Sequence, residues 1–411
     1  MRLPSPRSLL PLAASLALVV GEGCRDAAPP VVGTPPTADF VLAAGDSSFW
    51  VTSDHGTVHM RGAPLELARV DGHFYEIYVE DDDRSFQDAV LVGQRVYRRD
   101  LVSGDSLLVY EDTIVPRLAH TYARLHPDDV RVQPDDDTNE DPLWRATATV
   151  DLTDLHGPFL SYSLHVDVER DDASPWHASR RGVIDLSTGR RASLARVAAG
   201  DLAPIQKRRA LAVSATLDSV RTGGDRIDRA RTTALLGSYR LEPDGFAITL
   251  VDGEPAVSYA LAGTGSGEAG HLLELPPIRI GEPAWWAEVA PTLPVGSASG
   301  SRDVWRHGRY DVVVRYDTTE EDVARLFLRD STSREWLVGR VPAPALRIFW
   351  LDRPAVDSTA RRALQRAFDE SALYDEAART ASRRGRPARP IVRLVHDRKL
   401  HRRTTSLHHR A

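Results

Sequence analysis

An acidic run from Asp135 to Asp141 places oxygen ligands at alternating positions, as a calcium loop does. Glu140 stands where the sharp turn of such a loop needs glycine, and Ala146 stands where the closing bidentate glutamate belongs. The run is therefore predicted to be a solvated linker rather than a calcium site.

Three histidines near the N-terminus are the second group with ligand chemistry. His55 and His59 could share one face of a strand and approach His73 across a hairpin, which would begin a metal site. No carboxylate or cysteine stands at a ligand-like spacing from them. The sequence therefore predicts no metal and no other cofactor.

A serine nucleophile needs a sharp turn, usually between a strand and a helix. The nearest pattern, Gly263–Gly267 with Ser266 inside it, is predicted to lie in a hairpin loop. The same glycines lack the Lys-Ser/Thr ending of a phosphate-binding loop. Acidic residues are too dispersed to name a glycosidase pair. No catalytic residue is predicted, and a role without catalysis is favoured over an enzyme.

Tryptophans supply the remaining binding chemistry. Trp176 and His177 stand together in a segment predicted to be an exposed loop, and a flat indole face suits the apolar face of a sugar ring. These two residues are the candidate ligand-binding residues. The alternative for Trp176 is that its side chain packs in the core. Trp285 and Trp286 could also stack on a sugar, but core packing is the favoured interpretation for both.

The elements that must hold Trp176 and His177 are a strand, a loop and a returning strand. Apolar residues alternate with polar ones from Phe159 to Glu169, the pattern of a half-buried antiparallel strand. The loop is predicted over Asp171–Arg180, and the chain returns through Val183–Leu186. Ser187–Arg190 then reads as a turn with glycine where positive φ is tolerated.

The whole chain of 411 residues is long enough for two or three domains. The predicted fold class is β-rich α+β: an N-terminal all-β module, a central α+β module and a C-terminal β segment closed by a helix. Helical spacing is seen at 202–220 and 227–236, and the last helix is predicted to begin at an Asp357 or Ser358 cap. The predicted limits are 39–124 for the all-β module, 125–142 for an acidic linker, 143–295 for the α+β module, 296–381 for the β segment with its helix, and 382–411 for a basic tail.

The first 23 residues have the form of an export signal, with arginines at the start and an apolar stretch from Leu9 to Val20. Cys24 is the only cysteine in the chain, and its position resembles the lipidated cysteine of bacterial lipoproteins. Gly21 and Gly23 would also suit an ordinary signal cleavage, which would leave a secreted or periplasmic protein. A proline-rich tether at 24–38 follows. Lipid attachment at Cys24 is the favoured interpretation.

The net charge of −6 is mild for this length and predicts no nucleic-acid partner. The tail from Arg383 to Arg410 is strongly basic and could attract anionic lipid headgroups or envelope polymers. The partners predicted are therefore the membrane, through the lipid anchor, and peptidoglycan or another envelope protein.

Residues 143–280 resemble a bacterial extracytoplasmic α+β domain, shared by a lysozyme-sensing anti-sigma factor and the non-catalytic part of a peptidoglycan deacetylase. That family has a Gly-Gly-Ala-His loop before a strand ending in Asp-x-x-Thr-Gly and a basic residue. Pro175–Ala178 and Asp185–Arg190 stand at the corresponding places. The later family strands look like Phe246–Tyr259 and Gly270–Leu275. The resemblance implies binding or sensing rather than catalysis.

The sequence thus predicts a lipid-anchored, extracytoplasmic protein of the bacterial cell envelope that binds or senses an envelope component. The alternative is a hydrolase acting on cell-wall or extracellular polymer. A third interpretation, a structural lipoprotein in a larger assembly, would be favoured by a large exposed apolar patch.

Overall fold

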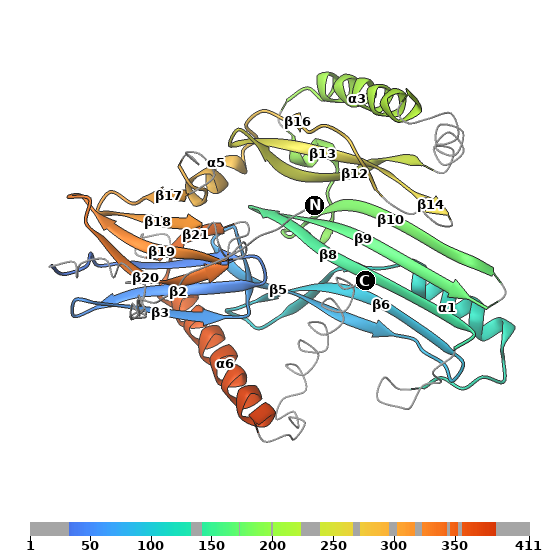
Figure 1. Ribbon diagram of the computed structural model, residues 1–411, viewed down its shortest axis with the longest axis horizontal. Coiled ribbons are helices and arrows are strands. Elements are labelled where there is room, and N and C mark those ends of the chain that lie inside the picture. Colours follow the sequence, from blue (N-terminus) through green and yellow to red (C-terminus); the bar gives the residue numbers. More distant parts are fainter. Residues whose placement is uncertain are drawn as a thin grey trace, which may run out of the picture. The chain divides into compact units, whose positions relative to one another are not determined.

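The computed structural model describes residues 33–132, 142–171, 173–198, 200–222, 239–265, 272–295, 302–316, 323–342, 346–351 and 356–383, with side chains up to 371. The described residues from Pro35 on belong to one compact unit. Strands dominate and few helices accompany them, so the prediction of a β-rich α+β fold is confirmed (Figure 1). None of the helices in the described part of the chain is long and apolar enough to cross a membrane.

The two ends of the described chain share one four-stranded sheet, here called the terminal sheet. Its strands run in the order β21-β1-β2-β3, and β1 pairs antiparallel with both β2 and β21. The strand bounds are β1 (Asp39–Ala44), β2 (Ser47–Asp54), β3 (Thr57–Ala63) and β21 (Leu346–Trp350). Residues more than 300 positions apart are therefore direct neighbours, as Val41 and Phe349 are.

A second four-stranded sheet, the C-terminal sheet, packs on one face of the terminal sheet. It has the order β17-β18-β19-β20, and fully buried Phe40, Leu42 and Ile348 meet Val312 and Leu326 in the core between the two sheets. Its strands are β17 (Arg302–Arg306), β18 (Tyr310–Tyr316), β19 (Val323–Asp330) and β20 (Glu335–Pro342).

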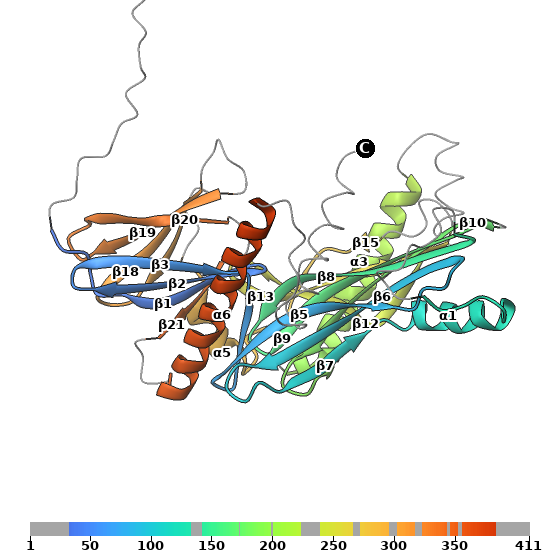
Figure 2. The same ribbon diagram turned by 90° about the horizontal axis from the view of Figure 1, so that it is seen from below.

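Helix α6 (Ser358–Arg383) lies across the other face of the terminal sheet (Figure 2). Side chains of β4 (Glu66–Val70) and β5 (His73–Asp83) belong to the same core. Trp50 packs edge-on against Phe368 of the helix. The Oδ1 atom of Asp357 accepts a hydrogen bond from the N–H of Ala360 at 2.7 Å, so Asp357 caps the helix as one of the two predicted candidates.

The largest sheet, here called the long sheet, has nine strands. Its main path is β11-β10-β9-β8-β6-β5-β4, with β7 paired to β6 and β14 paired to β10. Helix α1 (Ile114–Leu125) packs on it through Val115, Ala119 and Tyr122. The other strands are β6 (Ala89–Asp100), β7 (Ser106–Glu111), β8 (Trp144–His156), β9 (Phe159–Arg170), β10 (Ala173–Asp185), β11 (Arg190–Arg191) and β14 (Thr264–Gly265).

A small four-stranded sheet packs against β9 and β10, and a separate hydrophobic core lies between it and the long sheet. Phe159 and Val183 of the long sheet pack there with Phe246, Val257 and Tyr259. Helix α3 lies along this sheet and contributes Ile205 to the core (Figure 1). The elements are α2 (Leu194–Val197), α3 (Ala203–Thr222), β12 (Arg240–Val251), β13 (Glu254–Ala262), β15 (Leu273–Glu274), β16 (Ile278–Arg279), α5 (Trp286–Val289) and the 3₁₀ turn η2 (Ala290–Thr292).

The sheets do not follow the predicted module limits. Strands β1–β3 belong with β21, and β6 pairs in parallel with β8 across the predicted linker. The segment expected to contain only strands also ends in helix α1. Strand pairing joins residues far apart in the chain, which local patterns do not reveal. The predicted signal, Cys24, most of the tether, the helix at 227–236, the acidic run and the basic tail beyond Arg383 lie outside the described residues.

Candidate functional site

Most of the predicted loop at Asp171–Arg180 is a strand. Residues from Ala173 on belong to β10, which pairs with β9 and, at His177 and Ala178, also with β14. Pro175 falls where the register with β9 shifts, and such an irregularity tolerates a residue without an N–H. The prediction of an exposed loop was wrong because both edges of this segment find strand partners.

Trp176 and His177 therefore point to opposite faces of the long sheet, since side chains alternate along a strand. Trp176 is opposite Val168 and packs, partly buried, against the core of the long sheet. His177 lies on the other face, where its Nδ1 is 2.6 Å from Oδ1 of Asp167. The structure does not bring the two candidates together into one surface.

The face that holds His177 also brings together a serine, a histidine and an aspartate. Nδ1 of His165 lies 3.0 Å from Oγ of Ser179, and Nε2 of His165 lies 3.7 Å from Asp151. Ser179 is only 3% exposed and sits on a regular strand directly opposite His165. A nucleophile must reach its substrate, so this arrangement acts as a cross-strand contact rather than a hydrolytic centre.

The other residues considered from the sequence have structural positions. Trp286 is buried, and Trp285 packs on Phe159 and donates its indole N–H to the carbonyl of Val197 at 2.8 Å. His59 lies on the terminal sheet and His73 on the long sheet, where His73 contacts Asp100. Within the described ranges no three His, Cys, Asp or Glu side chains are placed to hold a metal.

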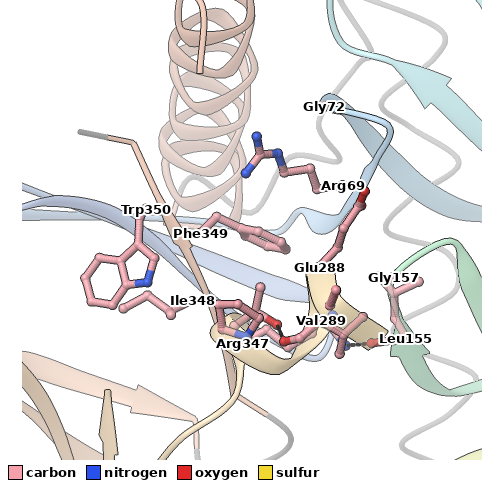
Figure 3. Close-up of a pocket in the computed structure, with 13 residues that line it drawn as sticks. Arg69, Gly72, Leu155, Gly157, Glu288, Val289, Arg347, Ile348, Phe349 and Trp350 are labelled. Carbon is pink, nitrogen blue, oxygen red and sulfur yellow. Dashed lines mark hydrogen bonds between the residues drawn. The ribbon is translucent and has the colours of Figure 1, made fainter. Parts of the chain in front are cut away.

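A cavity of about 330 Å³ opens where the terminal sheet meets the turn between β8 and β9 and the short helix α5 (Figure 3). Its walls come from four distant parts of the chain, and much of the lining is apolar. The lining residues are Arg69, Gly72, Leu155, Gly157, Ala287, Glu288, Val289, Pro291, Thr292, Arg347, Ile348, Phe349 and Trp350.

Gly157 allows α5 to approach the turn between β8 and β9. Its φ is +58°, in the left-handed region that favours glycine, and a Cβ there would lie 2.9 Å from Cγ2 of Val289. The hydrogen bond from Trp285 to Val197 holds the start of the same helix. One wall of the cavity is thus positioned by close packing rather than by a long element.

Arg347 is the buried cation of the cavity. It interrupts the apolar strand β21, is only 8% exposed, and faces the same side of the sheet as Phe349. Its Nη1 donates to the carbonyl of Leu155 at 3.0 Å, which joins the terminal sheet to the end of β8 (Figure 3). Among the residues that the structure describes, its buried Nε finds no hydrogen-bond partner. A buried guanidinium with unused donors is costly unless another acceptor reaches it.

Three ionisable side chains surround Arg347. Burial raises the pKa of Glu66 to about 7, although the charge of Arg347 opposes this rise. Burial also raises the pKa of Asp154, again against the effect of Arg347. For His156, burial and then Arg347 lower the pKa to about 4, so its ring is neutral at pH 7. Burial lowers the pKa of Arg347 itself, while Glu66 and Asp154 raise it.

Arg69 and Glu288 are the remaining charged groups in the cavity lining. Arg69 is partly buried, and burial lowers its pKa while the nearby Glu288 carboxylate raises it. Glu288 is exposed on α5. The cavity therefore combines apolar walls, one buried cation and a pair of opposite charges, which suits a ligand with an apolar part and a polar, acceptor-rich group.

None of the cavity-lining residues, and none of the ionisable groups around Arg347, was predicted from the sequence to be functional. The sequence signal in this region is Arg347, a charged residue inside the otherwise apolar run Leu346–Trp350. A charge in a buried strand needs a partner from elsewhere in the fold. Neither Glu66 nor Leu155 is recognisable as that partner from its position in the sequence.

Comparisons with known proteins add little to this geometry. No protein-family model matches the chain, and no curated protein matches it. Among solved structures, a DUF3298 family protein from Pseudomonas aeruginosa aligns with 53% of this chain and 91% of its own length, at 11% identity and a TM-score of 0.25. Such a low TM-score does not establish a shared fold.

Proposed function

We propose that the protein is an exported, lipid-anchored component of the bacterial cell envelope that binds a wall component without catalysis, and that the cavity beside Arg347 is its binding site. The observation that carries this proposal is the partly apolar cavity of about 330 Å³ with a buried guanidinium in its lining. Preformed cavities with a few polar groups are the usual form of a small-ligand site.

Two features of the sequence support the location and the class of function. The first 23 residues have the form of an export signal, and Cys24 stands where a lipid anchor would be attached. The resemblance of 143–280 to the extracytoplasmic domain of an anti-sigma factor and a peptidoglycan deacetylase favours binding or sensing. The hydrolase alternative is weakened because Ser179, the serine placed beside a histidine and an aspartate, is enclosed.

The test is co-sedimentation of the chain from residue 25 on with insoluble peptidoglycan, at low and high salt. Ala287→Trp would fill the cavity, since Ala287 is an exposed residue of its lining. Ala290→Trp is the matched control, because Ala290 is also exposed and follows directly on α5 but does not line the cavity. High salt suppresses the nonspecific attraction of the basic tail.

Salt-resistant binding that is lost in Ala287→Trp and kept in Ala290→Trp would support the proposal. Salt-resistant binding that both variants retain would exclude the cavity as the site. If the wild-type chain does not sediment with the wall under either condition, the wall-binding function is wrong and a protein partner or an assembly role becomes the better explanation.

A further inference from the structure

The buried guanidinium of Arg347 restricts the chemistry of any ligand that enters the cavity. Within the described part of the chain its one hydrogen bond goes to the carbonyl of Leu155, and its Nε has no acceptor. A guanidinium carries five N–H donors in a planar fork that matches the oxygens of a carboxylate or a phosphate. The side chain is therefore incompletely satisfied by the protein alone.

The acidic neighbours of Arg347 compensate its charge only in part. Glu66 and Asp154 interact with it electrostatically, but burial raises the pKa of Glu66 to about 7 and raises the pKa of Asp154 above its ordinary value. Apolar residues such as Leu155, Val289 and Phe349 line the same cavity, and Arg347 itself is only 8% exposed. Charge interactions are stronger in such a place than in water, so an anionic group would gain more here than at an exposed arginine.

We propose that the ligand of this cavity presents an oxyanion, a carboxylate or a phosphate, that accepts hydrogen bonds from the guanidinium of Arg347. The inference rests on the proposed wall-binding function and names the chemical group that the cavity recognises. Both groups occur in envelope polymers, and both match the planar fork of donors. The apolar walls would contact the part of the ligand that bears the oxyanion.

The test changes the chemistry of the wall material and compares the same two chains, the wild type and Ala287→Trp, on every form of it. Insoluble wall material is prepared in four forms: untreated, with carboxyl groups amidated by carbodiimide and ammonia, with phosphates removed by cold hydrofluoric acid, and with both treatments. The measured quantity is the salt-resistant binding of the wild-type chain minus that of Ala287→Trp. This difference removes any contribution of the basic tail.

Loss of one charge-assisted pairing should weaken this binding about tenfold or more. A loss on amidation alone identifies a carboxylate, and a loss on hydrofluoric acid treatment alone identifies a phosphate. Undiminished binding to the doubly treated wall would overturn the oxyanion inference and leave the proposed function standing. Absence of binding to the untreated wall would instead overturn the proposed function, and the inference with it.

A protein variant gives a second, independent measurement. Arg347→Lys keeps the positive charge that Glu66 and Asp154 face but removes the planar fork, so we expect about tenfold weaker binding to the untreated wall. Arg315→Lys is the matched control, since Arg315 also lies on a strand and pairs with a carboxylate, Glu335, outside the cavity lining. If Arg347→Lys binds the untreated wall as tightly as Arg315→Lys does, and both melt at the same temperature as the wild type, the role of Arg347 is contradicted.

Discussion

Glutamine in place of Glu66 is expected to change how the stability of the protein depends on pH. Glu66 and His156 both lie near Arg347, and burial shifts their pKa values in opposite directions. The carboxyl of Glu66 holds its proton up to about pH 7, whereas an unfolded chain releases it near 4.5. The ring of His156 stays neutral down to about pH 4, whereas an unfolded chain protonates it near 6.5.

The sign of each contribution follows from which state binds more protons. Between pH 4.5 and about 7 the folded chain retains the proton of Glu66, so the free energy of unfolding falls as pH rises. Between about pH 4 and 6.5 the unfolded chain binds a proton at His156, so the free energy of unfolding rises with pH. Each pH unit corresponds to about 1.4 kcal/mol, so each full contribution is about 3 kcal/mol and the two largely cancel where they overlap.

Glu66→Gln should remove the pH-dependent contribution of Glu66 to the free energy of unfolding and leave that of His156. The free energy of unfolding of the variant, minus that of the wild type, should rise by about 3 kcal/mol between pH 4.5 and about 7. His156→Phe should show the opposite trend, a difference that falls by about 3 kcal/mol from about pH 4 to 6.5. Neither ring nitrogen of His156 has a hydrogen-bond partner in the described ranges, so the apolar replacement breaks no such bond there.

The assay is urea unfolding followed by tryptophan fluorescence at half-unit steps from about pH 4 to 8. Glu282→Gln controls for the loss of a carboxyl group as such, because Glu282 is exposed and lies outside the cavity lining. If Glu66→Gln differs from the wild type by the same amount at every pH, Glu66 does not titrate in this window and the account of the ionisable groups around Arg347 is wrong.

Three further substitutions test other parts of the structure. Asp357→Ala removes the acceptor for the N–H of Ala360, so urea titration should show a free energy of unfolding that is lower by about 1 kcal/mol. A decrease smaller than a few tenths of a kcal/mol would contradict the role of Asp357 as a cap. Gly182→Ala would place a Cβ 2.6 to 2.8 Å from the hydroxyl and ring of Tyr162, so we expect a loss of about 1–3 kcal/mol, measured as a lower melting temperature. Trp176→Ala should lower the melting temperature because core packing is lost, and it should leave salt-resistant wall binding unchanged. Loss of wall binding at an unchanged melting temperature would show instead that Trp176 contacts the ligand.

Much of the local structure could be predicted because its causes lie within a few residues. Alternation of apolar and polar side chains identifies β9, and the Asp357 cap marks the start of α6. In the predicted turn, Oδ1 of Asp185 accepts the N–H of Ser187 at 2.9 Å and Gly189 has a φ of +67°. Each of these features depends on residues that are adjacent in the chain.

The sequence did not reveal which strands pair with β10. This pairing determined where the side chains of Trp176 and His177 lie. Acidic residues and Pro175 near the start of β10 favour a loop, yet β9 on one side and β14 on the other supply hydrogen bonds that make the segment a strand. Strand geometry then sends Trp176 into the core and His177 to the opposite face. Adjacent residues in the sequence are therefore separated by the sheet.

The sequence by itself determined the β-rich fold class, the strand at Phe159–Glu169 and the cap that begins the last helix. Only the tertiary structure decided that Arg347, Leu155 and Glu288 line one cavity, because they are separated by more than 50 positions and meet through strand pairing and helix docking. The physical reason is that periodicity and caps report local backbone preferences. A site is made by long-range packing, which places a charge from one apolar strand beside a carbonyl and carboxyl groups from others.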